Sequence, residues 1–544
     1  MAILFLTLIS LGIRVWKLNH GLPIAHYSDE GHYIYFALNM GSGDLNPHHF
    51  FHPSLYFYFC FLADVLYGLF GFAAGFFKSP AEVWQQYLAN PAPFYTLNRF
   101  VTAVMGAMTV PLVYGVGKKY FDKKTGLIAS FFLGFSFLHI QYSQIANMDV
   151  PLTFFVMLAF FFAMRAFEKG NARDFLLSGL IGGFSAATKY QGFETLLWGP
   201  LACFLIALRE KRNPAAGILD KRCFLFLIFF AVGFTVATPY WILDFSQFKH
   251  DFLWNWSYYK SFGKGQLGYE GDWNWLYYLN VLFSYGMGWP LAFAGLAGMG
   301  ILFSRLSLNN IFLMSFPVIY FAIAGFSKIR TARYLLPLIP FLSLSAAYFT
   351  VWLMSKFLKG QHKSKLWALG MASFLIALPS LISTSQYAYI RNSPDTRNLA
   401  AEWIRTQIPS GSKVLQSAYA FLPSWPSGPE FEALDPTLLN TRVENLSSLK
   451  SLDDYRKEGF RYLILDEWHQ GIVFEEGARF PRYSDAVARY HELKGELERS
   501  AQLIKTFSPY GRKHVPFDME NVEIPSRSLS QMRRPGPTAW IYKL

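Results

Sequence analysis

The sequence predicts a polytopic α-helical membrane protein that ends in a soluble α/β domain. Of its 544 residues 53% are hydrophobic and 19% aromatic, and only 16% are charged, whereas soluble domains carry roughly 25% charge. Long apolar runs recur through the first part of the chain, as in membrane-spanning helices. After about residue 384, polar residues, Pro and Gly become frequent, and no apolar run of 18 residues remains. We therefore predict a membrane domain over 1–383 and a soluble domain over 384–544.

Composition also excludes some classes of function. The net charge is +13, but the basic residues gather in short loops between apolar runs, which is typical of cytoplasmic loops rather than of a surface that binds nucleic acid. The three cysteines lie in apolar stretches without disulfide or zinc spacing. The N-terminal run Ala2–Leu11 lacks a basic region before it, so we expect a retained helix and not a cleaved signal.

Eleven apolar segments are predicted to cross the membrane. They are, approximately, Ala2–Leu18, Tyr95–Gly117, Thr125–Ile145, Val150–Phe167, Phe175–Thr188, Phe193–Leu208, Cys223–Leu243, Leu276–Phe303, Ile311–Phe326, Tyr334–Leu353 and Leu366–Ile382. A further segment, Pro53–Phe77, is also long enough to span, but it lies in the first loop (about 19–95) and contains Asp64. Whether this segment crosses decides the side of every later loop.

The distribution of Lys and Arg resolves this ambiguity. If Pro53–Phe77 does not cross, the loops on the same side of the membrane as the N-terminus hold seventeen Lys and Arg residues, and the loops on the other side hold eight. If Pro53–Phe77 crosses, the loops after it exchange sides, and nearly all of the seventeen basic residues then lie on the side of the membrane opposite to the N-terminus. Because cytoplasmic loops carry the basic excess, we predict that Pro53–Phe77 is interfacial or re-entrant and that residues after about Ser383 lie outside. The carboxylates and cations discussed next then share the outer face.

Three carboxylates lie at predicted membrane boundaries. Asp29 and Glu30 are adjacent, so on a regular element they point apart, and we expect one to face a site and the other a structural partner or a metal. Ser28 or Asp29 as a helix cap is the alternative. Asp149 precedes a Pro by two positions, so it too is either a site residue or a cap.

Four cations lie at the same predicted face. Lys189 stands between two apolar segments, where it either serves a site or extends to the membrane surface. Lys328, Arg330 and Arg333 oppose the positive-inside trend, and an anionic lipid or a phosphate would explain them. External carboxylates beside external cations indicate transfer of a sugar from a lipid phosphate to a hydroxyl. The carboxylate would be the general base, the cations would stabilise the leaving phosphate, and direct attack would invert the anomeric carbon.

The outer loop Asp244–Trp275 is rich in Trp and Tyr. This composition is typical of an interfacial aromatic belt. Its glycines also permit an alternative, a mobile cover over a lipid-linked substrate. They are Gly263, Gly265, Gly268 and Gly271.

In the soluble part the periodicity predicts a helix over Thr396–Ile408, a largely helical segment over Ser484–Phe507 and three strands. The strands are Lys413–Ser417, Arg461–Leu465 and Thr538–Tyr542. We find no catalytic motif there, and Asp466–Glu467 is more typical of exposed acidic residues at a strand end.

The motifs, in their order and spacing, resemble those of the GT-C-fold, polyprenyl-phosphate-dependent glycosyltransferases, which include protein O-mannosyltransferases and the aminoarabinose transferases of lipid A. The resemblance covers roughly residues 1–350. It rests on Ser28–Tyr33, Gly43–Pro47, His52–Tyr56, Asn98–Phe100, Gln141–Pro151, Thr188–Tyr190 and Arg333–Pro337. The chain has Pro53–Ser54 where the family usually has two prolines.

The resemblance implies an inverting transferase with Asp29 as catalytic base and Asp149 as a second acidic site residue, and we group Glu30 with these two. Lys189, Arg330 and Arg333 would contact the carrier phosphate. The further candidates for substrate binding are Tyr33, His52, Arg99, Lys328 and Tyr334. No cofactor is expected to be required and no metal ligand is assigned. A divalent metal at His48, His49 and His52 is the alternative to packed or solvated histidines.

The expected partners are a polyprenyl-phosphate sugar donor, membrane lipids, and a protein, lipid or glycan acceptor. The expected location is the plasma membrane of a bacterium or archaeon, with the site and the soluble domain outside. A transporter or flippase of a lipid-linked or anionic solute is the main alternative, although it would more often show internal repeats or paired broken helices. A receptor or assembly subunit would tolerate Asp29→Asn, and the Asp-Glu motif in the first loop argues against an O-antigen-ligase-like enzyme.

Overall fold

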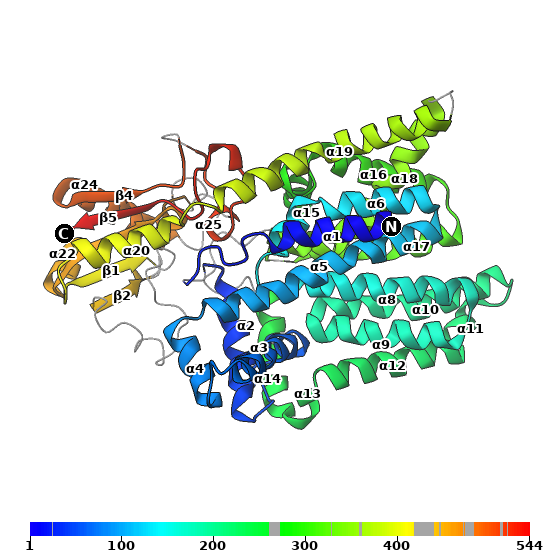
Figure 1. Ribbon diagram of the computed structural model, residues 1–544, viewed down its shortest axis with the longest axis horizontal. Helices are drawn as coiled ribbons and strands as arrows, with labels where there is room; N and C mark the ends of the chain where they lie inside the picture. The colour runs from blue at the N-terminus through cyan, green and yellow to red at the C-terminus, as the bar shows by residue number, and fades with distance from the viewer. Residues whose placement is uncertain are drawn as a thin grey trace.

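The protein consists of a helical bundle and a smaller domain built on a β-sheet (Figure 1). The computed structural model describes residues 1–23, 26–260, 273–327, 329–357, 362–417, 440–444, 448–471, 473, 484–511, 515–518 and 520–544. The predicted fold class, a helical membrane domain followed by an α/β domain, is confirmed.

One large apolar core holds the bundle together. Its longer helices are α1 (Ala2–Val15), α5 (Ala92–Tyr120), α6 (Lys123–Gly134), α8 (Asp149–Lys169), α9 (Ala172–Thr188), α10 (Trp198–Arg209), α12 (Lys221–Ala237), α16 (Trp289–Ser304), α17 (Leu308–Phe326), α18 (Ile339–Phe357) and α19 (His362–Ile390). Shorter elements connect them: α7 (Phe137–Tyr142), α11 (Pro214–Ile218), α13 (Tyr240–Leu243), α15 (Trp275–Val281), η2 (Tyr190–Leu197), η3 (Leu282–Gly286) and η4 (Ala332–Leu338).

The length and composition of these helices are those of an integral membrane protein. Within the described ranges, seven helical segments are long and apolar enough to cross a membrane, and two shorter helices, Ala2–Val15 and Trp289–Ser304, are also apolar. The seven are Leu55–Ala73, Ala92–Tyr120, Asp149–Lys169, Tyr190–Arg209, Leu308–Phe326, Ala332–Phe357 and Ser364–Ile390. The number of eleven crossings stays a prediction.

Two segments predicted as continuous helices are broken, and the two breaks contact each other. The predicted helix Thr125–Ile145 ends at Gly134 and restarts at Phe137, while Leu276–Phe303 is interrupted between α15 and α16. Gly288 has a φ of +78°, a conformation that ends a right-handed helix and suits glycine. The Ser136 hydroxyl donates to the Gly286 carbonyl at 3.3 Å, so a polar group freed at one break is satisfied by the other.

The first loop folds into its own helices at the end of the bundle that faces the C-terminal domain. These are α2 (Ser28–Asn39), η1 (Met40–Ser42), α3 (Leu55–Ala73) and α4 (Pro80–Ala89), and α14 (Phe245–Lys260) lies with them (Figure 1). The interfacial or re-entrant position of Pro53–Phe77 stays a prediction, since α3 is itself long and apolar enough to cross a membrane. Gly263, Gly265, Gly268 and Gly271, on which the mobile-cover alternative depended, lie outside the described residues.

The chain leaves the bundle later than predicted. Helix α19 continues to Ile390, and α20 (Thr396–Gln407) begins after Asp395, whose carboxylate accepts the Arg397 N–H at 2.9 Å. The predicted boundary at 383/384 therefore falls inside α19. The apolar run ends near Ile382, but the polar residues that follow it continue the helix, since a helix requires apolar side chains only where it is buried or in lipid.

The C-terminal domain is a five-stranded mixed sheet in the order β2-β1-β3-β5-β4. The strands are β1 (Lys413–Ser417), β2 (Asn440–Glu444), β3 (Phe460–Asp466), β4 (Gln502–Phe507) and β5 (Ala539–Lys543). β1 runs parallel to β2 and β3, and β5 runs antiparallel to β3 and β4. The remaining elements are α22 (Leu452–Lys457), α23 (Glu467–Gly471), α24 (Ser484–Ser500), α25 (Glu520–Glu523) and η9 (Leu529–Gln531).

Alternate residues of the central strands face two small cores, as the period of a strand requires. Leu463 packs into the core that includes α22 and α24, and Ile464 packs into the one that includes α20. The prediction of a largely helical Ser484–Phe507 is wrong for its last part, because residues 502–507 form the edge strand β4. Ile504 and Phe507, residue types that favour strands, pack on the second core.

Candidate active site

Four charged side chains from four distant segments form a row of alternating sign at the end of the bundle. Asp29 lies in the first turn of α2, Arg333 in η4, Asp149 at the start of α8, and Lys189 directly after α9. Arg333 Nη1 lies 2.5 Å from Asp29 Oδ2, and Arg333 Nε lies 4.0 Å from Asp149 Oδ2. Lys189 Nζ donates to Asp149 Oδ1 at 2.5 Å. These four predicted residues therefore lie together.

The two aspartates do not cap their helices. The N-cap of α2 is Tyr27, with no capping side chain, and the Asp29 carboxylate is directed to Arg333. At α8 the Asn147 side chain accepts the N–H of Asp149 at 2.9 Å and that of Val150 at 3.3 Å. The Asp149 carboxylate is thereby left for Lys189, so the capping alternative for these carboxylates is not what the structure shows.

The row has a buried end and an accessible end. The side chains of Asp149 and Lys189 are 3% and 6% exposed, whereas those of Asp29 and Arg333 are 26% and 23% exposed. Lys189 therefore does not extend to the surface, and its ammonium lies 4.9 Å from the centre of the Tyr334 ring, a cation–π contact. Asp29 and Arg333 are thus the part of the row that solvent reaches, and the Asp149–Lys189 pair is buried next to Arg333.

The Asp29 carboxylate is held in its ionised form. Burial raises the pKa of this group, but the charge and hydrogen bond of Arg333, with a smaller contribution from His52, outweigh burial and lower the pKa to about 2. Arg333 also donates a hydrogen bond to the Tyr27 hydroxyl and lies over the Tyr27 ring. One guanidinium thus contacts two carboxylates and a phenol, which fixes its plane.

Glu30 and Arg99 form a separate, fully buried ion pair. Their two contacts are each 2.7 Å, and Glu30 also accepts the Ala146 N–H at 2.7 Å. Arg99 donates to the carbonyl oxygens of Leu18 and His20 at 2.6 and 2.8 Å. The adjacent carboxylates therefore point apart as expected, one to the site and one to a structural partner. The pair joins the first loop to the bundle, and the predicted roles of Glu30 in catalysis and Arg99 in substrate binding stay predictions.

The remaining predicted residues contact aromatic rings or lie outside the described part of the chain. The rings of Tyr33 and His52 lie 5.8 Å apart, and His52 is near enough to Asp29 to help lower the pKa of its carboxyl. The Arg330 guanidinium lies 4.9 Å from the centre of the Tyr277 ring. Lys328 lies outside the described residues.

The first-loop histidines have different partners. His48 lies 2.7 Å from the Asp44 carboxylate, His49 stacks on Phe36 with 4.6 Å between ring centres, and His52 packs on Tyr33. Among the residues that the structure describes, no group of three or more His, Cys, Asp or Glu side chains could hold a metal ion. The expectation that no metal is required stays a prediction.

Sequence reasoning missed one carboxylate that the C-terminal domain contributes. Glu520 of α25 accepts the Ala332 N–H at 3.1 Å and the Tyr277 hydroxyl. It therefore holds both the backbone next to Arg333 and the ring beneath Arg330. Burial raises the pKa of the Glu520 carboxyl. No motif marks this residue, because its contacts depend on how the domain docks on the bundle.

A family model and a yeast relative match part of the chain. A family model described as dolichyl-phosphate-mannose-protein mannosyltransferase matches residues 96–242. Dolichyl-phosphate-mannose--protein mannosyltransferase 1 of Saccharomyces cerevisiae is 26% identical over 165 residues, which are 26% of this chain and 20% of the yeast protein. The chain thus spans only a fifth of that relative.

Two solved structures share the fold over most of the chain. The apo oligosaccharyltransferase of Archaeoglobus fulgidus has a TM-score of 0.55 at 12% identity, over 93% of this chain and 73% of that one. ArnT from Cupriavidus metallidurans, bound to undecaprenyl phosphate, has a TM-score of 0.50 at 12% identity, over 89% and 94%. The chain has the GT-C fold, and the predicted resemblance to GT-C glycosyltransferases is confirmed.

Proposed function

We propose that this protein is an inverting glycosyltransferase that moves a sugar from a polyprenyl-phosphate carrier to an acceptor hydroxyl. The observation that carries the proposal is the position of Arg333, which contacts the accessible Asp29 on one side and approaches the buried Asp149–Lys189 pair on the other. A general base therefore lies directly beside cations that suit a phosphate. The acceptor is a protein, a lipid or a glycan.

The chemistry follows from these positions. Asp29 takes the proton of the acceptor hydroxyl while the oxygen attacks the anomeric carbon. The bond from that carbon to the phosphate oxygen breaks, and its electron pair leaves with the polyprenyl phosphate. Arg333 and Lys189 stabilise the charge that develops on the phosphate. Attack opposite to the leaving group inverts the anomeric configuration, and no cofactor takes part in these steps.

The ion pair between Asp29 and Arg333 explains how a carboxylate with a pKa of about 2 can act as a base. Such a group is ionised but weakly basic. A phosphate that binds Arg333 competes with Asp29 for the guanidinium, and the basicity of Asp29 then rises. Donor binding therefore activates the base only when the leaving group is in place.

The solved relatives support a lipid phosphate as the ligand class. The A. fulgidus enzyme has been solved in complex with an inhibitory peptide and a dolichol-phosphate, and ArnT with undecaprenyl phosphate. We infer the same class of carrier here. We also infer that the site and the C-terminal domain face the outside of a bacterial or archaeal plasma membrane, since the Lys- and Arg-rich segment around α11 lies at the opposite end of the bundle (Figure 1).

The test is transfer of radiolabelled sugar from polyprenyl-phosphate sugars by the purified protein in liposomes. We expect Asp29→Asn to lower the rate by about 10²–10⁴, the usual contribution of a general base. Asp44→Asn is the matched control, because Asp44 is a first-loop carboxylate that is 55% exposed and pairs with His48. Equal rates for wild type and Asp29→Asn would exclude Asp29 as the base. Solute movement without transfer would favour a transporter.

A further inference from the structure

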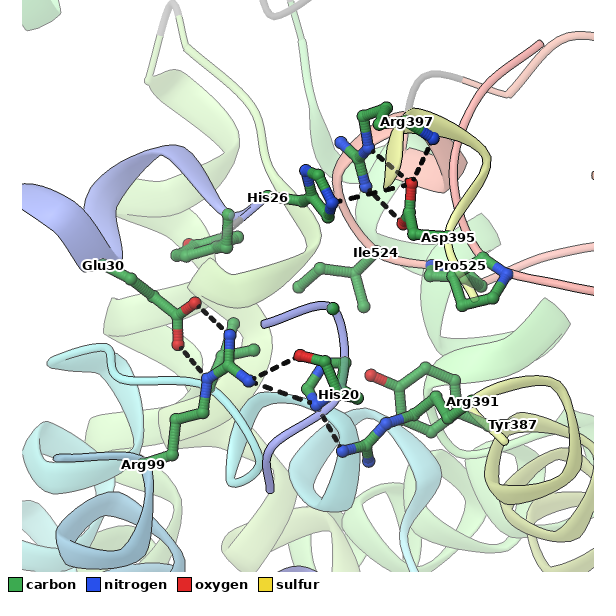
Figure 2. Close-up of a pocket in the computed structure, with 14 residues that line it drawn as sticks. His20, His26, Glu30, Arg99, Tyr387, Arg391, Asp395, Arg397, Ile524 and Pro525 are labelled. Atoms are coloured by element: carbon green, nitrogen blue, oxygen red, sulfur yellow. Dashed lines mark hydrogen bonds and ion pairs between the residues drawn. The ribbon is translucent and has the colours of Figure 1, made fainter. Parts of the chain in front are cut away.

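A small polar cavity lies where the first loop, the end of α19 and the C-terminal domain meet (Figure 2). Its volume is about 30 Å³, which is enough for one or two water-sized particles. The charged and titratable side chains in its walls are those of His20, His26, Tyr27, Glu30, Arg99, Tyr387, Arg391, Asp395 and Arg397, and the other lining residues are Gly21, Ile145, Ile524, Pro525 and Pro535.

The charges around this cavity do not balance. Arg99 pairs with Glu30, and Arg397 pairs with Asp395 at 2.8 Å, and Figure 2 shows these two pairs on different sides of the cavity. Arg391 is the third guanidinium, and no carboxylate of the described residues forms an ion pair with it. With both histidines neutral, the described walls therefore carry one excess positive charge.

Arg391 is bonded only to neutral groups. It is 4% exposed, and it donates to the Gln144 side chain, the Lys17 carbonyl and His20. Burial lowers the pKa of the Arg391 guanidinium to about 10, as expected for a buried charge without full compensation. The C-terminal end of α19 supplies only about half an elementary charge. A positive charge thus remains in a nearly closed space.

Three buried polar atoms at the cavity have no hydrogen-bond partner: Arg391 Nε, Tyr387 Oη and His26 Nδ1. The first two are donors on neighbouring side chains, since the Arg391 guanidinium lies 5.1 Å from the centre of the Tyr387 ring. His26 bonds Asn398 Oδ1 through Nε2 at 2.6 Å, and burial lowers its pKa to about 4, so at neutral pH its Nδ1 accepts. A water that donates to His26 and to an anion on Arg391 and Tyr387 would satisfy all three atoms.

We propose that this cavity binds one small monovalent anion of the size of chloride, held by Arg391 and Tyr387. The anion neutralises the unpaired guanidinium and occupies the space between the first loop and the C-terminal domain. Because Asp395 and Arg397 belong to that domain and His26 to the loop that leads to Asp29, anion binding stabilises the docked arrangement of the two halves. The proposal does not depend on the reaction catalysed.

The test is thermal unfolding of the purified full-length protein, with sodium gluconate replaced stepwise by sodium chloride at constant ionic strength. We expect the unfolding temperature of the wild type to rise saturably with chloride, and bromide to act in the same way. In Arg391→Gln this rise should be absent. Arg305→Gln, which removes an exposed arginine at the other end of the bundle bonded to Tyr348, should keep it.

Tyr387→Phe keeps the proposal testable if Arg391→Gln does not fold. It removes one donor and leaves the charge, so the half-saturating chloride concentration should rise by about fivefold, as for the loss of one hydrogen bond. Equal unfolding temperatures of the wild type in chloride and gluconate would overturn the proposal. So would a chloride response that Tyr387→Phe and Arg391→Gln both leave unchanged, since the anion would then bind elsewhere.

Discussion

Removal of the Asp29 charge should slow transfer by about 10²–10⁴ and at the same time tighten the binding of polyprenyl phosphate. The two effects have opposite signs because Arg333 is shared: it contacts Asp29 at 2.5 Å, and the phosphate must compete with that contact. In Asp29→Asn the neutral amide remains a hydrogen-bond acceptor but no longer attracts the guanidinium as an ion. Arg333 then keeps only the more distant Asp149, at 4.0 Å, as its anionic neighbour and can bind the phosphate more strongly.

The size of the gain can be worked out from the pKa of Asp29. Arg333 and His52 lower this pKa from 3.8 to about 2, although burial opposes them, and the difference corresponds to about 2.5 kcal/mol. A phosphate that replaces Asp29 on part of the guanidinium recovers a part of this free energy. We therefore expect Asp29→Asn to bind polyprenyl phosphate between about fivefold and about sixtyfold more tightly than the wild type.

Binding of a short-chain radiolabelled polyprenyl phosphate to purified protein in nanodiscs measures this effect directly. Asp44→Asn again serves as the control, because it removes a first-loop carboxylate that does not contact Arg333. The gain should shrink in Arg333→Gln, in which the guanidinium is absent from both backgrounds. Unchanged or weaker binding by Asp29→Asn would refute the reasoning that phosphate and Asp29 compete for one cation.

Three further predictions concern pH, the buried pair and the C-terminal carboxylate. Because the pKa of Asp29 is lowered to about 2, the base stays charged until the pH falls toward that value, and kcat/KM should show no acid limb from Asp29 between pH 8 and 5. Lys189→Met removes the nearer cation of the buried Asp149, leaving Arg333 at 4.0 Å, and should destabilise the fold by up to about 3–5 kcal/mol, seen as a lower unfolding temperature. Glu520→Ala removes the acceptor of the Ala332 N–H and should raise the KM for the donor about tenfold or more, while Glu520→Gln, which keeps a carbonyl acceptor, should raise it less.

A specific result would contradict each of these three predictions. An inflection of kcat/KM between pH 5 and 7 that Asp44→Asn retains would contradict a base that is already ionised. Equal thermal stability of Lys189→Met and wild type would mean that the buried pair is not required. Equal donor KM in wild type and Glu520→Ala would show that the C-terminal domain does not position the Arg330–Arg333 segment.

The main residues of the site could be predicted because membrane topology restricts where charges lie. Asp29, Asp149, Lys189 and Arg333 are far apart in sequence, but each stands at the end of an apolar run. An ionisable group at such a place is costly unless it has a partner or a function, and the positive-inside rule put all four on one face. Membrane topology does not determine which carboxylate pairs with which cation. Glu30 was therefore grouped with the catalytic residues, although the structure pairs it with Arg99.

Features that depend on tertiary packing were missed. A hydropathy window averages over a helix break, so hydropathy did not predict the breaks near Ser136 and Gly288. Side chains of other segments form hydrogen bonds with backbone groups near these breaks. The edge strand β4 reads as part of the preceding helix because half of its residues are polar. Glu520 lies in a polar segment without a recognisable pattern, and only the docked domain shows that it reaches Ala332.

The attachment of the C-terminal domain has a consequence for domain exchange between relatives. Several parts of the first loop and the bundle are bonded to it, and three of these contacts are His26 to Asn398 at 2.6 Å, Gln141 to the Pro525 carbonyl at 2.7 Å, and Ala332 to Glu520. Two of these parts lie within a few residues of Asp29 and Arg333. A chimera that carries only a foreign C-terminal domain would therefore disturb the base and the cation together. We expect acceptor preference to be transferable only when the bundle residues at these three attachments are exchanged with the domain.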